Sequence, residues 1–325
     1  MIAHLGGSHE EVEHGSEPST TDVSHRSLWR RWLGGRRPAS AVRSRSVPTA
    51  FVLAGGGTRG AVQVGMLAEL VKRGISADRV YGASVGAVNA AAYCGDPTPA
   101  GMEHLEAVWR SLSGEVVFPR SRVHGPWRYL QRRPSVHANT GLRRIIEEGL
   151  VFERLEDAPI PLEVVATSLT GGEERWLTRG AAVEAVLASA AIPAIFPPVE
   201  IGGELLVDGG VVNNVPISRP LAAGIKRIYV LLCGPLDYRP PAPGRPIEAV
   251  LTAFFVAIHA RFARELAALP PDVEVIVLTG GGEPGGDYRD FSSTAEMIEA
   301  GRAAVASALG RTGPSAAADP VGAHG

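Results

Sequence analysis

Cysteine is scarce in this sequence. A chain of 325 residues contains only two, Cys94 and Cys233, and both stand in apolar surroundings. A disulfide framework needs more cysteines than this, so the class of small disulfide-stapled extracellular folds is excluded. We expect both residues to be buried free thiols in a reducing compartment, and hence a cytoplasmic protein.

Long apolar runs are absent as well. The most apolar stretch, residues 183–199, is interrupted by Pro193, Pro197 and Pro198, whereas a membrane-spanning helix needs roughly 18 to 20 successive apolar residues. The first residues contain His and Glu in place of the basic start and apolar stretch of a signal peptide. We therefore expect neither a membrane span nor secretion by this route.

Charge of one sign is not in excess. The formal net charge is −2, so no global positive field attracts nucleic acid or an anionic membrane. We expect no nucleic-acid partner, and the composition indicates no particular oligomeric state. With 45% hydrophobic and 20% charged residues, the chain is typical of a globular protein with an ample core.

The two ends of the chain differ in composition from its middle. Residues 1–48 are polar, which predicts a disordered arm because such a segment cannot offset the entropy lost on ordering. Between Arg26 and Arg45 this arm has seven arginines, two tryptophans and no acidic residue. That pattern fits peripheral contact with an anionic membrane surface, and an ordinary solvated arm fits it too. Residues 49–310 form the predicted domain, and residues 311–325 a flexible tail.

From Thr49 onward, short apolar runs alternate with longer amphipathic ones, a pattern typical of an α/β fold with a mainly parallel sheet. Strands are predicted at residues 50–54, 79–81, 162–168, 205–207, 227–232 and 273–278. Helices are predicted at residues 61–72, 85–93, 141–148, 181–190, 247–268 and 294–309.

A G-x-S-x-G pentapeptide, Gly82 to Gly86, has Ser84 at its centre and lies between a predicted strand and a predicted helix. A serine on so sharp a turn projects its oxygen above the sheet, and the flanking glycines avoid clashes in the tight backbone. The N-terminus of the following helix favours developing negative charge. Ser84 is therefore the candidate nucleophile, although the same pentapeptide also occurs as a mere tight turn in Gly-rich chains.

A second glycine-rich turn, GGGTRG at residues 55–60, also follows a strand and opens a helix. Its main-chain N–H groups can bind a phosphate or the oxyanion of a tetrahedral acyl intermediate. The glycine spacing fits the G-x-G-x-x-G of dinucleotide-binding folds. However, Asp78 precedes the next strand where an acidic residue should end it, and the G-K-[ST] ending of a P-loop is missing. Nucleotide binding stays the lesser alternative.

Asp208 follows the predicted strand at residues 205–207 and precedes two glycines. A carboxylate at a strand end can approach another strand-end loop, and in a partly dehydrated site it can accept the proton of a serine hydroxyl. Asp208 is therefore the candidate base.

Together and in this order, these motifs resemble those of the patatin-like phospholipase family. The similar segments are FVLAGGGTRGA (51–61) for the oxyanion loop, VYGASVGA (80–87) for the nucleophile elbow, ASAAIP with FPP (188–193, 196–198) for the proline-rich segment, and VDGG with NNVP (207–210, 213–216) for the loop of the aspartate. The similarity extends over about residues 51–232.

The resemblance implies a three-layer α/β sandwich with a mainly parallel central sheet. It also implies hydrolysis of fatty acyl esters of phospholipids or lysophospholipids through an acyl-enzyme, with a Ser-Asp dyad, no catalytic histidine and no cofactor. The residue roles that it implies are Ser84 as nucleophile, Asp208 as general base, the backbone of Gly55, Gly56 and Gly57 as oxyanion hole, and Arg59 as a residue that orders this loop. The sequence departs from the family pattern at Ala54, where many relatives have a polar residue or glycine, and this puts the hydrogen bonding of the loop in question.

A general carboxylesterase with a Ser-His-Asp triad is an alternative, because His259 follows Ser84 and Asp208 in the order that an α/β-hydrolase requires. His259 lies in a predicted helix, however, where a histidine is more often structural. A protein that binds lipid without turnover is a further alternative.

The remaining histidines and one long connection give weaker indications. His104, His124 and His137 are expected on the surface or in loops, and none shows metal-ligand spacing, so we expect no metal. Residues 112–137 are compatible either with a lid that contacts lipid or with a connection whose aromatic residues pack into the core.

Overall fold

The structure is a computed structural model of the chain, and it describes residues 47–119, 135–235, 242, 244, 246–280 and 288–310. Residues 1–46 of the predicted arm and the predicted tail at residues 311–325 lie outside the described residues. The predicted domain limits therefore stay a prediction.

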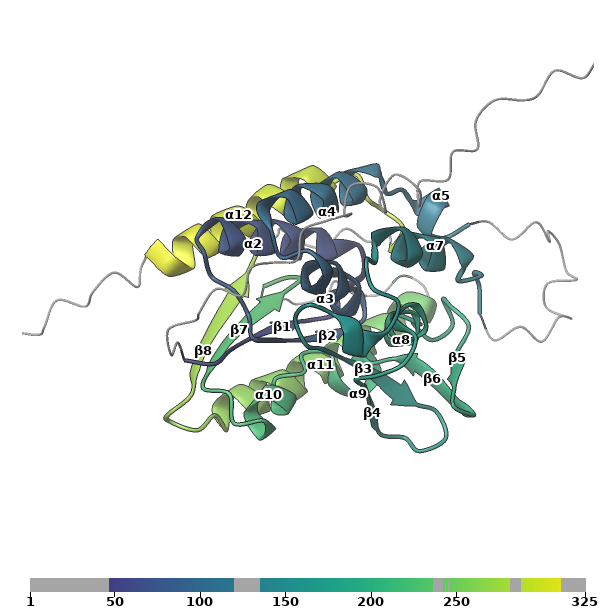
Figure 1. Ribbon diagram of the computed structural model, residues 1–325. Coiled ribbons are helices and arrows are strands. Elements are labelled where there is room, and N and C mark those ends of the chain that lie inside the picture. Colours follow the sequence, from purple (N-terminus) through teal and green to yellow (C-terminus); the bar gives the residue numbers. More distant parts are fainter. Residues whose placement is uncertain are drawn as a thin grey trace, which may run out of the picture. The chain divides into compact units, whose positions relative to one another are not determined.

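Within the described residues, one sheet of eight strands forms the centre of the fold, as the alternating sequence pattern predicts (Figure 1). The strands are β1 (Thr49–Leu53), β2 (Arg79–Ala83), β3 (Leu162–Ser168), β4 (Glu174–Leu177), β5 (Val199–Ile201), β6 (Glu204–Asp208), β7 (Arg227–Leu232) and β8 (Glu274–Thr279). Their order is β5-β6-β3-β2-β1-β7-β8, with β4 paired to β3. Strands β3, β2, β1, β7 and β8 run parallel, whereas β4, β5 and β6 pair antiparallel.

Helices cover both faces of this sheet (Figure 1). The longer helices are α2 (Ala61–Lys72), α3 (Val85–Gly95), α4 (Pro99–Ser111), α7 (Thr140–Gly149), α8 (Ala182–Ser189), α11 (Pro246–Ala267) and α12 (Thr294–Gly310). Short helical turns are η1 (Gly57–Gly60), α5 (Gly114–Val117), η2 (Leu155–Asp157), α9 (Gly210–Asn213) and α10 (Ser218–Ala222). Because α2, α4 and α12 pack on one face and α10 and α11 on the other, the predicted three-layer α/β sandwich is confirmed.

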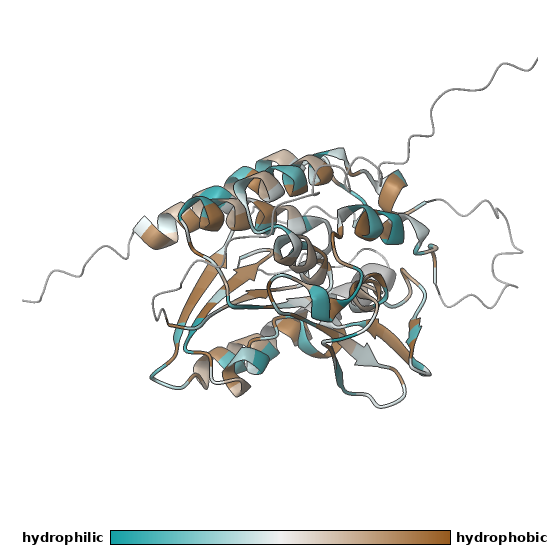
Figure 2. Ribbon diagram, in the orientation of Figure 1, coloured by the Kyte–Doolittle hydropathy of each residue, from teal (hydrophilic) through white to brown (hydrophobic). Residues whose placement is uncertain are grey.

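The central strand β1 shows how the sequence divides its side chains between the two faces. Phe51 and Leu53 belong to the core under α2 and α12, and Ala50 and Val52 belong to the core over α11. Successive side chains of a strand point to opposite faces, so a strand that is covered twice must be apolar throughout. Figure 2 shows this pattern, with predominantly apolar strands between helices that carry both polar and apolar residues.

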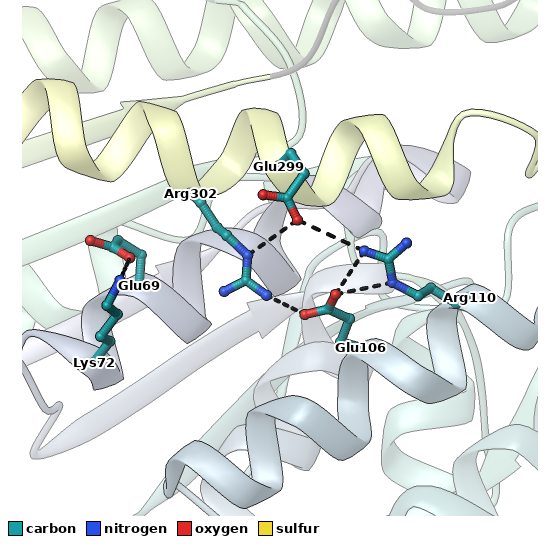
Figure 3. A network of polar contacts seen from close by, with 6 residues as sticks. All are labelled: Glu69, Lys72, Glu106, Arg110, Glu299 and Arg302. Carbon is teal, nitrogen blue, oxygen red and sulfur yellow. Dashed lines mark hydrogen bonds and ion pairs between the residues drawn. The ribbon is translucent and has the colours of Figure 1, made fainter.

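Two helices distant in the sequence are also joined by charged side chains, as Figure 3 shows. Glu106 of α4 accepts hydrogen bonds from Arg110 Nη2 at 2.8 Å and from Arg302 of α12, while Glu299 lies 3.5 Å from Arg302 Nε. Glu106 and Arg302 are partly buried, whereas Glu299 is exposed. Ion pairs this close to the surface contribute about 0.2–1 kcal/mol each, so they add only modestly to the contact between α4 and α12.

Part of the segment at residues 112–137 lies in the core. Phe118 is buried and its ring stacks on Phe196 with the centroids 5.4 Å apart. His137 lies in a loop, as expected, but it is buried there, with Nε2 3.1 Å from Tyr288 Oη. Residues 120–134, the middle of the proposed lid, lie outside the described residues.

Helix α4 and strands β4 and β5 were not among the predicted elements. None of the helices in the described part of the chain combines the length and the apolar character needed to cross a bilayer.

Candidate active site

Strand β3 brings the candidate nucleophile and base together. Val165 pairs with Ala83 at the end of β2, and the next residue, Ala166, pairs with Asp208 at the end of β6. Neighbouring residues of a strand are only about 3.3 Å apart along its axis. The turn that begins with Ser84 and the turn that follows Asp208 therefore start beside neighbouring residues in the middle of β3, although the two residues are 124 positions apart in the sequence.

Ser84 stands at the strained turn that the pentapeptide predicts. It has φ 55° and ψ −130° between β2 and α3, a backbone conformation that costs on the order of 1–3 kcal/mol in a residue other than glycine. The turn also needs its glycines, because a Cβ on Gly86 would lie 2.2 Å from Leu53 O and one on Gly82 would lie 2.7 Å from the Ala87 Cα. The N-terminus of α3 thus begins directly after the serine.

Ser84 and Asp208 are in direct contact. Ser84 Oγ donates a hydrogen bond of 2.6 Å to Asp208 Oδ2, and the Gly210 N–H donates one of 2.7 Å to Oδ1. Asp208 is only 2% exposed. Burial raises the pKa of Asp208 from 3.8 to about 7, and the hydrogen bonds from Ser84 and Gly210 oppose this rise. Near neutral pH this carboxylate is therefore poised both to accept and to release a proton.

Ser189 at the end of α8 holds these two turns together, and sequence reasoning gave it no role. Its carbonyl oxygen accepts hydrogen bonds from the N–H groups of Ser84 and Gly209, each at 3.1 Å. Its Oγ donates to Val165 O at 2.6 Å and accepts from the Ser84 N–H at 3.1 Å. The only signal in the sequence was its place in the ASAAIP segment.

The glycine loop lies beside the serine, since a Cβ on Gly55 would lie 2.9 Å from the Ser84 Cβ. Its three N–H groups are not equivalent, however. The Gly55 N–H donates to Asn214 O at 3.1 Å and is already engaged, whereas those of Gly56 and Gly57 donate to no acceptor within the described residues. The structure therefore narrows the expected oxyanion donors from three glycines to Gly56 and Gly57.

The carbonyl groups of this loop are held in place, and that fixes the free N–H groups. In a trans peptide the C=O and the following N–H point in opposite directions. Asn214 Nδ2 donates to Gly55 O at 3.2 Å, which directs the Gly56 N–H away from Asn214. The Arg59 N–H donates to Gly56 O at 3.3 Å and its Nε does so at 3.4 Å, which fixes the Gly57 N–H in the same way. Arg59 thus contacts the loop through both its backbone and its side chain.

Asn214 is a further residue that sequence reasoning did not single out. It binds Gly55 through both its backbone and its side chain, and its Oδ1 would lie 2.6 Å from a Cβ on Gly210. It therefore connects the glycine loop to the turn after Asp208. The signal was the NNVP segment, which gave no indication of these contacts.

His259 lies within α11, as the helical pattern predicts, and its side chain is outside the described residues. In a Ser-His-Asp triad an imidazole separates the serine from the carboxylate. Here the two are hydrogen-bonded to each other, an arrangement that leaves no space for a ring between them.

Other reactive groups lie outside this arrangement. Cys94 and Cys233 are buried and free, as expected. Within the described ranges, no group of three or more His, Cys, Asp or Glu residues is placed to hold a metal ion.

Comparisons with known proteins show what the chain is similar to. The profile of the family Patatin-like phospholipase matches residues 51–221, more than half of the chain. The chain is 31% identical to an uncharacterized NTE family protein of Mycobacterium bovis over 238 residues. The aligned part covers 71% of this chain and 60% of that protein. It is 29% identical to Lysophospholipase NTE1 of Mycosarcoma maydis over 195 residues. The aligned part covers 59% of this chain and 10% of that protein.

Among solved structures, human GIVD cytosolic phospholipase A2 in complex with methyl gamma-linolenyl fluorophosphonate is similar with a TM-score of 0.41 and 13% identity, over 88% of this chain and 62% of that one. The chain thus spans less than two thirds of each of these relatives.

Proposed function

The chain belongs to the patatin-like phospholipase family, and we propose that it hydrolyses fatty acyl esters of phospholipids or lysophospholipids with Ser84 as nucleophile and Asp208 as the only base. The observation that carries this proposal is the 2.6 Å hydrogen bond from Ser84 Oγ to Asp208 Oδ2 at the strained turn between β2 and α3.

In the first half of the reaction, Ser84 Oγ attacks the ester carbonyl carbon while its proton passes to Asp208. The carbonyl oxygen becomes an oxyanion, which the N–H groups of Gly56 and Gly57 stabilise together with the N-terminus of α3. When the tetrahedral intermediate collapses, the bond to the leaving alcohol breaks and Asp208 returns its proton to that oxygen. The products are the alcohol and an acyl-enzyme.

In the second half, a water molecule takes the place of the alcohol. Asp208 accepts a proton from this water as it attacks the acyl carbonyl, and the same donors hold the second oxyanion. Collapse releases the fatty acid and returns the proton to Ser84 Oγ. One carboxylate with a pKa of about 7 serves both halves because it is protonated and deprotonated with similar ease near neutral pH.

The proposed class of lipid substrate is supported by the relatives of the chain, whereas the proposed Ser-Asp dyad is supported by the geometry of the site. A relative named as a lysophospholipase covers 59% of this chain, so a lysophospholipid is the first substrate to test. Contact of the Arg-rich segment at residues 26–45 with a membrane surface stays a prediction from the sequence, because these residues lie outside the described ones.

Labelling with a fluorophosphonate tests the proposal. This reagent phosphonylates an activated serine, so the wild-type chain should be labelled at Ser84, and Ser84→Ala should lose both the label and about 10³-fold or more of ester hydrolysis. His259→Ala serves as the matched control and should keep both. Label at another serine, or loss of the label in His259→Ala, would refute the Ser-Asp assignment.

A further inference from the structure

Three polar side chains form a hydrogen-bonded chain beneath the glycine loop. Gln63 of α2, Asn89 of α3 and Trp109 of α4 are 0%, 0% and 4% exposed. Trp109 Nε1 donates to Asn89 Oδ1 at 2.9 Å, and Asn89 Nδ2 donates to Gln63 Oε1 at 2.9 Å. None of the three is part of the Ser-Asp dyad or of the oxyanion loop.

These three hydrogen-bonded side chains donate to backbone carbonyls at the start and the end of the glycine loop. Gln63 Nε2 donates to Ala54 O at 2.8 Å and to Leu231 O of β7 at 3.0 Å. Asn89 Nδ2 donates its second hydrogen to Gly60 O at 3.0 Å. Ala54 precedes Gly55 and Gly60 closes η1, so these two contacts bracket the segment that contains the free N–H groups.

The contact at Ala54 fixes the peptide plane that leads into the oxyanion donors. The C=O of this plane is held by Gln63, and its N–H, which belongs to Gly55, is held by Asn214 O at 3.1 Å. A planar peptide that is bonded at both edges cannot rotate without breaking a hydrogen bond. The next two N–H groups along the chain are those of Gly56 and Gly57. Asn214 and Arg59 hold the peptide planes of these two groups, and Gln63 anchors the plane from which they continue.

Burying two amides is unfavourable unless all their polar atoms find partners. Here both hydrogens of Gln63 Nε2 and of Asn89 Nδ2 are used, and so are both side-chain oxygens. Apolar residues of similar size would fill this part of the core without that requirement. They would lack the amide donors to the carbonyls of Ala54 and Gly60, and Ala54 O would keep only the weak donor Cys233 Sγ at 3.4 Å among side chains of the described residues.

We propose that Gln63 and Asn89 are positioning residues, which orient the Gly56 and Gly57 N–H groups toward the developing oxyanion through the carbonyls of Ala54 and Gly60. This inference rests on the proposed function. At Ala54, where the sequence departs from the family pattern, the backbone carbonyl is bound from α2 by Gln63.

Gln63→Met tests the role, since methionine matches glutamine in length but donates no hydrogen bond. Removing one oxyanion donor outright costs about 10²–10³-fold in kcat, so a displaced donor should cost about 10–100-fold in kcat and leave KM nearly unchanged. A trifluoromethyl ketone, which forms a tetrahedral adduct with an active serine, should bind more weakly by a similar factor. Trp109→Phe removes only the donor to Asn89, at the far end of the hydrogen-bonded series, and should lower kcat by about threefold to tenfold.

Leu70→Ala is the matched control, because Leu70 is a fully buried residue of the same helix whose side chain belongs to the apolar core. It should lower the thermal unfolding midpoint and leave kcat and the ketone affinity unchanged. The inference is overturned if folded Gln63→Met keeps the wild-type kcat and ketone affinity. If Gln63→Met does not fold, Trp109→Phe decides. The inference is overturned if Trp109→Phe lowers the thermal unfolding midpoint but keeps the wild-type kcat. Absence of hydrolysis and labelling in the wild-type chain would instead refute the proposed function.

Discussion

Asp208 can act as a base only while its carboxylate is ionised, so the rate of hydrolysis should depend on pH through this one group. Burial raises its pKa to about 7, against the hydrogen bonds from Ser84 and the Gly210 N–H that favour the charged form. The protonated form therefore prevails below neutral pH, and a neutral carboxyl group is too weak a base to take the serine proton. Activity should rise as the pH increases through about 7 and then reach a plateau.

The size of the effect follows from the same pKa. Each pH unit below about 7 reduces the ionised fraction about tenfold, so kcat/KM at pH 5 should be about 100-fold below its plateau. A carboxylate in water, with a pKa of 3.8, would leave the rate almost unchanged over this range. The acid limb thus distinguishes a buried base from an exposed one.

The assay is the pH profile of kcat/KM on a short-chain ester without titratable groups, since this parameter reports the ionisation of the free enzyme. His259→Ala should give the same profile as wild type. A profile that is flat down to pH 5 would show that Asp208 is not the base or is not dehydrated. A limb that disappears in His259→Ala would show that a histidine accepts the proton.

Two further predictions concern stability and the nucleophile turn. A folded pKa raised above the unfolded one contributes stability at low pH that is lost as the pH rises through about 7. Asp208→Asn should therefore stabilise the fold against urea by about 4 kcal/mol at pH 8 and by less than half of that at pH 5, and it should abolish turnover. A gain in stability that does not vary with pH would contradict this reasoning. Gly86→Ala must displace Leu53 O, 2.2 Å from the new Cβ, so a loss of fluorophosphonate labelling together with a lower unfolding midpoint is expected, and a variant with unchanged labelling would show that the turn tolerates a side chain.

The sequence predicted the sheet well because its strands are buried on both faces. Residues 162–168 and 227–232 are predicted and observed with the same limits, since an apolar run between polar loops has few other solutions. The short strands β4 and β5 were missed because they contain Glu174, Arg175 and Glu200, and their pairing depends on partners elsewhere in the chain. Helix α4 was missed although Thr98 caps it, with its Oγ1 accepting from the Gly101 N–H at 3.1 Å.

In the candidate site too, features that depend on neighbouring residues could be predicted, whereas contacts between distant residues could not. The turns around Ser84, Asp208 and the glycines are encoded by neighbouring residues, so motifs find them. The contacts that hold the turns against one another join distant residues: Gln63 reaches Leu231 across 168 positions and Asn214 reaches Gly55 across 159. Their acceptors are backbone carbonyls, which every residue has. A sequence therefore gives no sign of which carbonyl a buried amide will bind.

This division explains why Gly55 was assigned a free N–H that it does not have. Three successive glycines look equivalent in a motif, but a loop can offer its N–H groups to a substrate only where other groups hold its carbonyls. The C=O before Gly56 is held by Asn214 and the one before Gly57 by Arg59, whereas the N–H of Gly55 itself is used to bind the loop to Asn214. One glycine thus attaches the loop and two can bind an anion. Asn214 should therefore matter to oxyanion binding as much as Arg59 does, although only the arginine stands inside the motif.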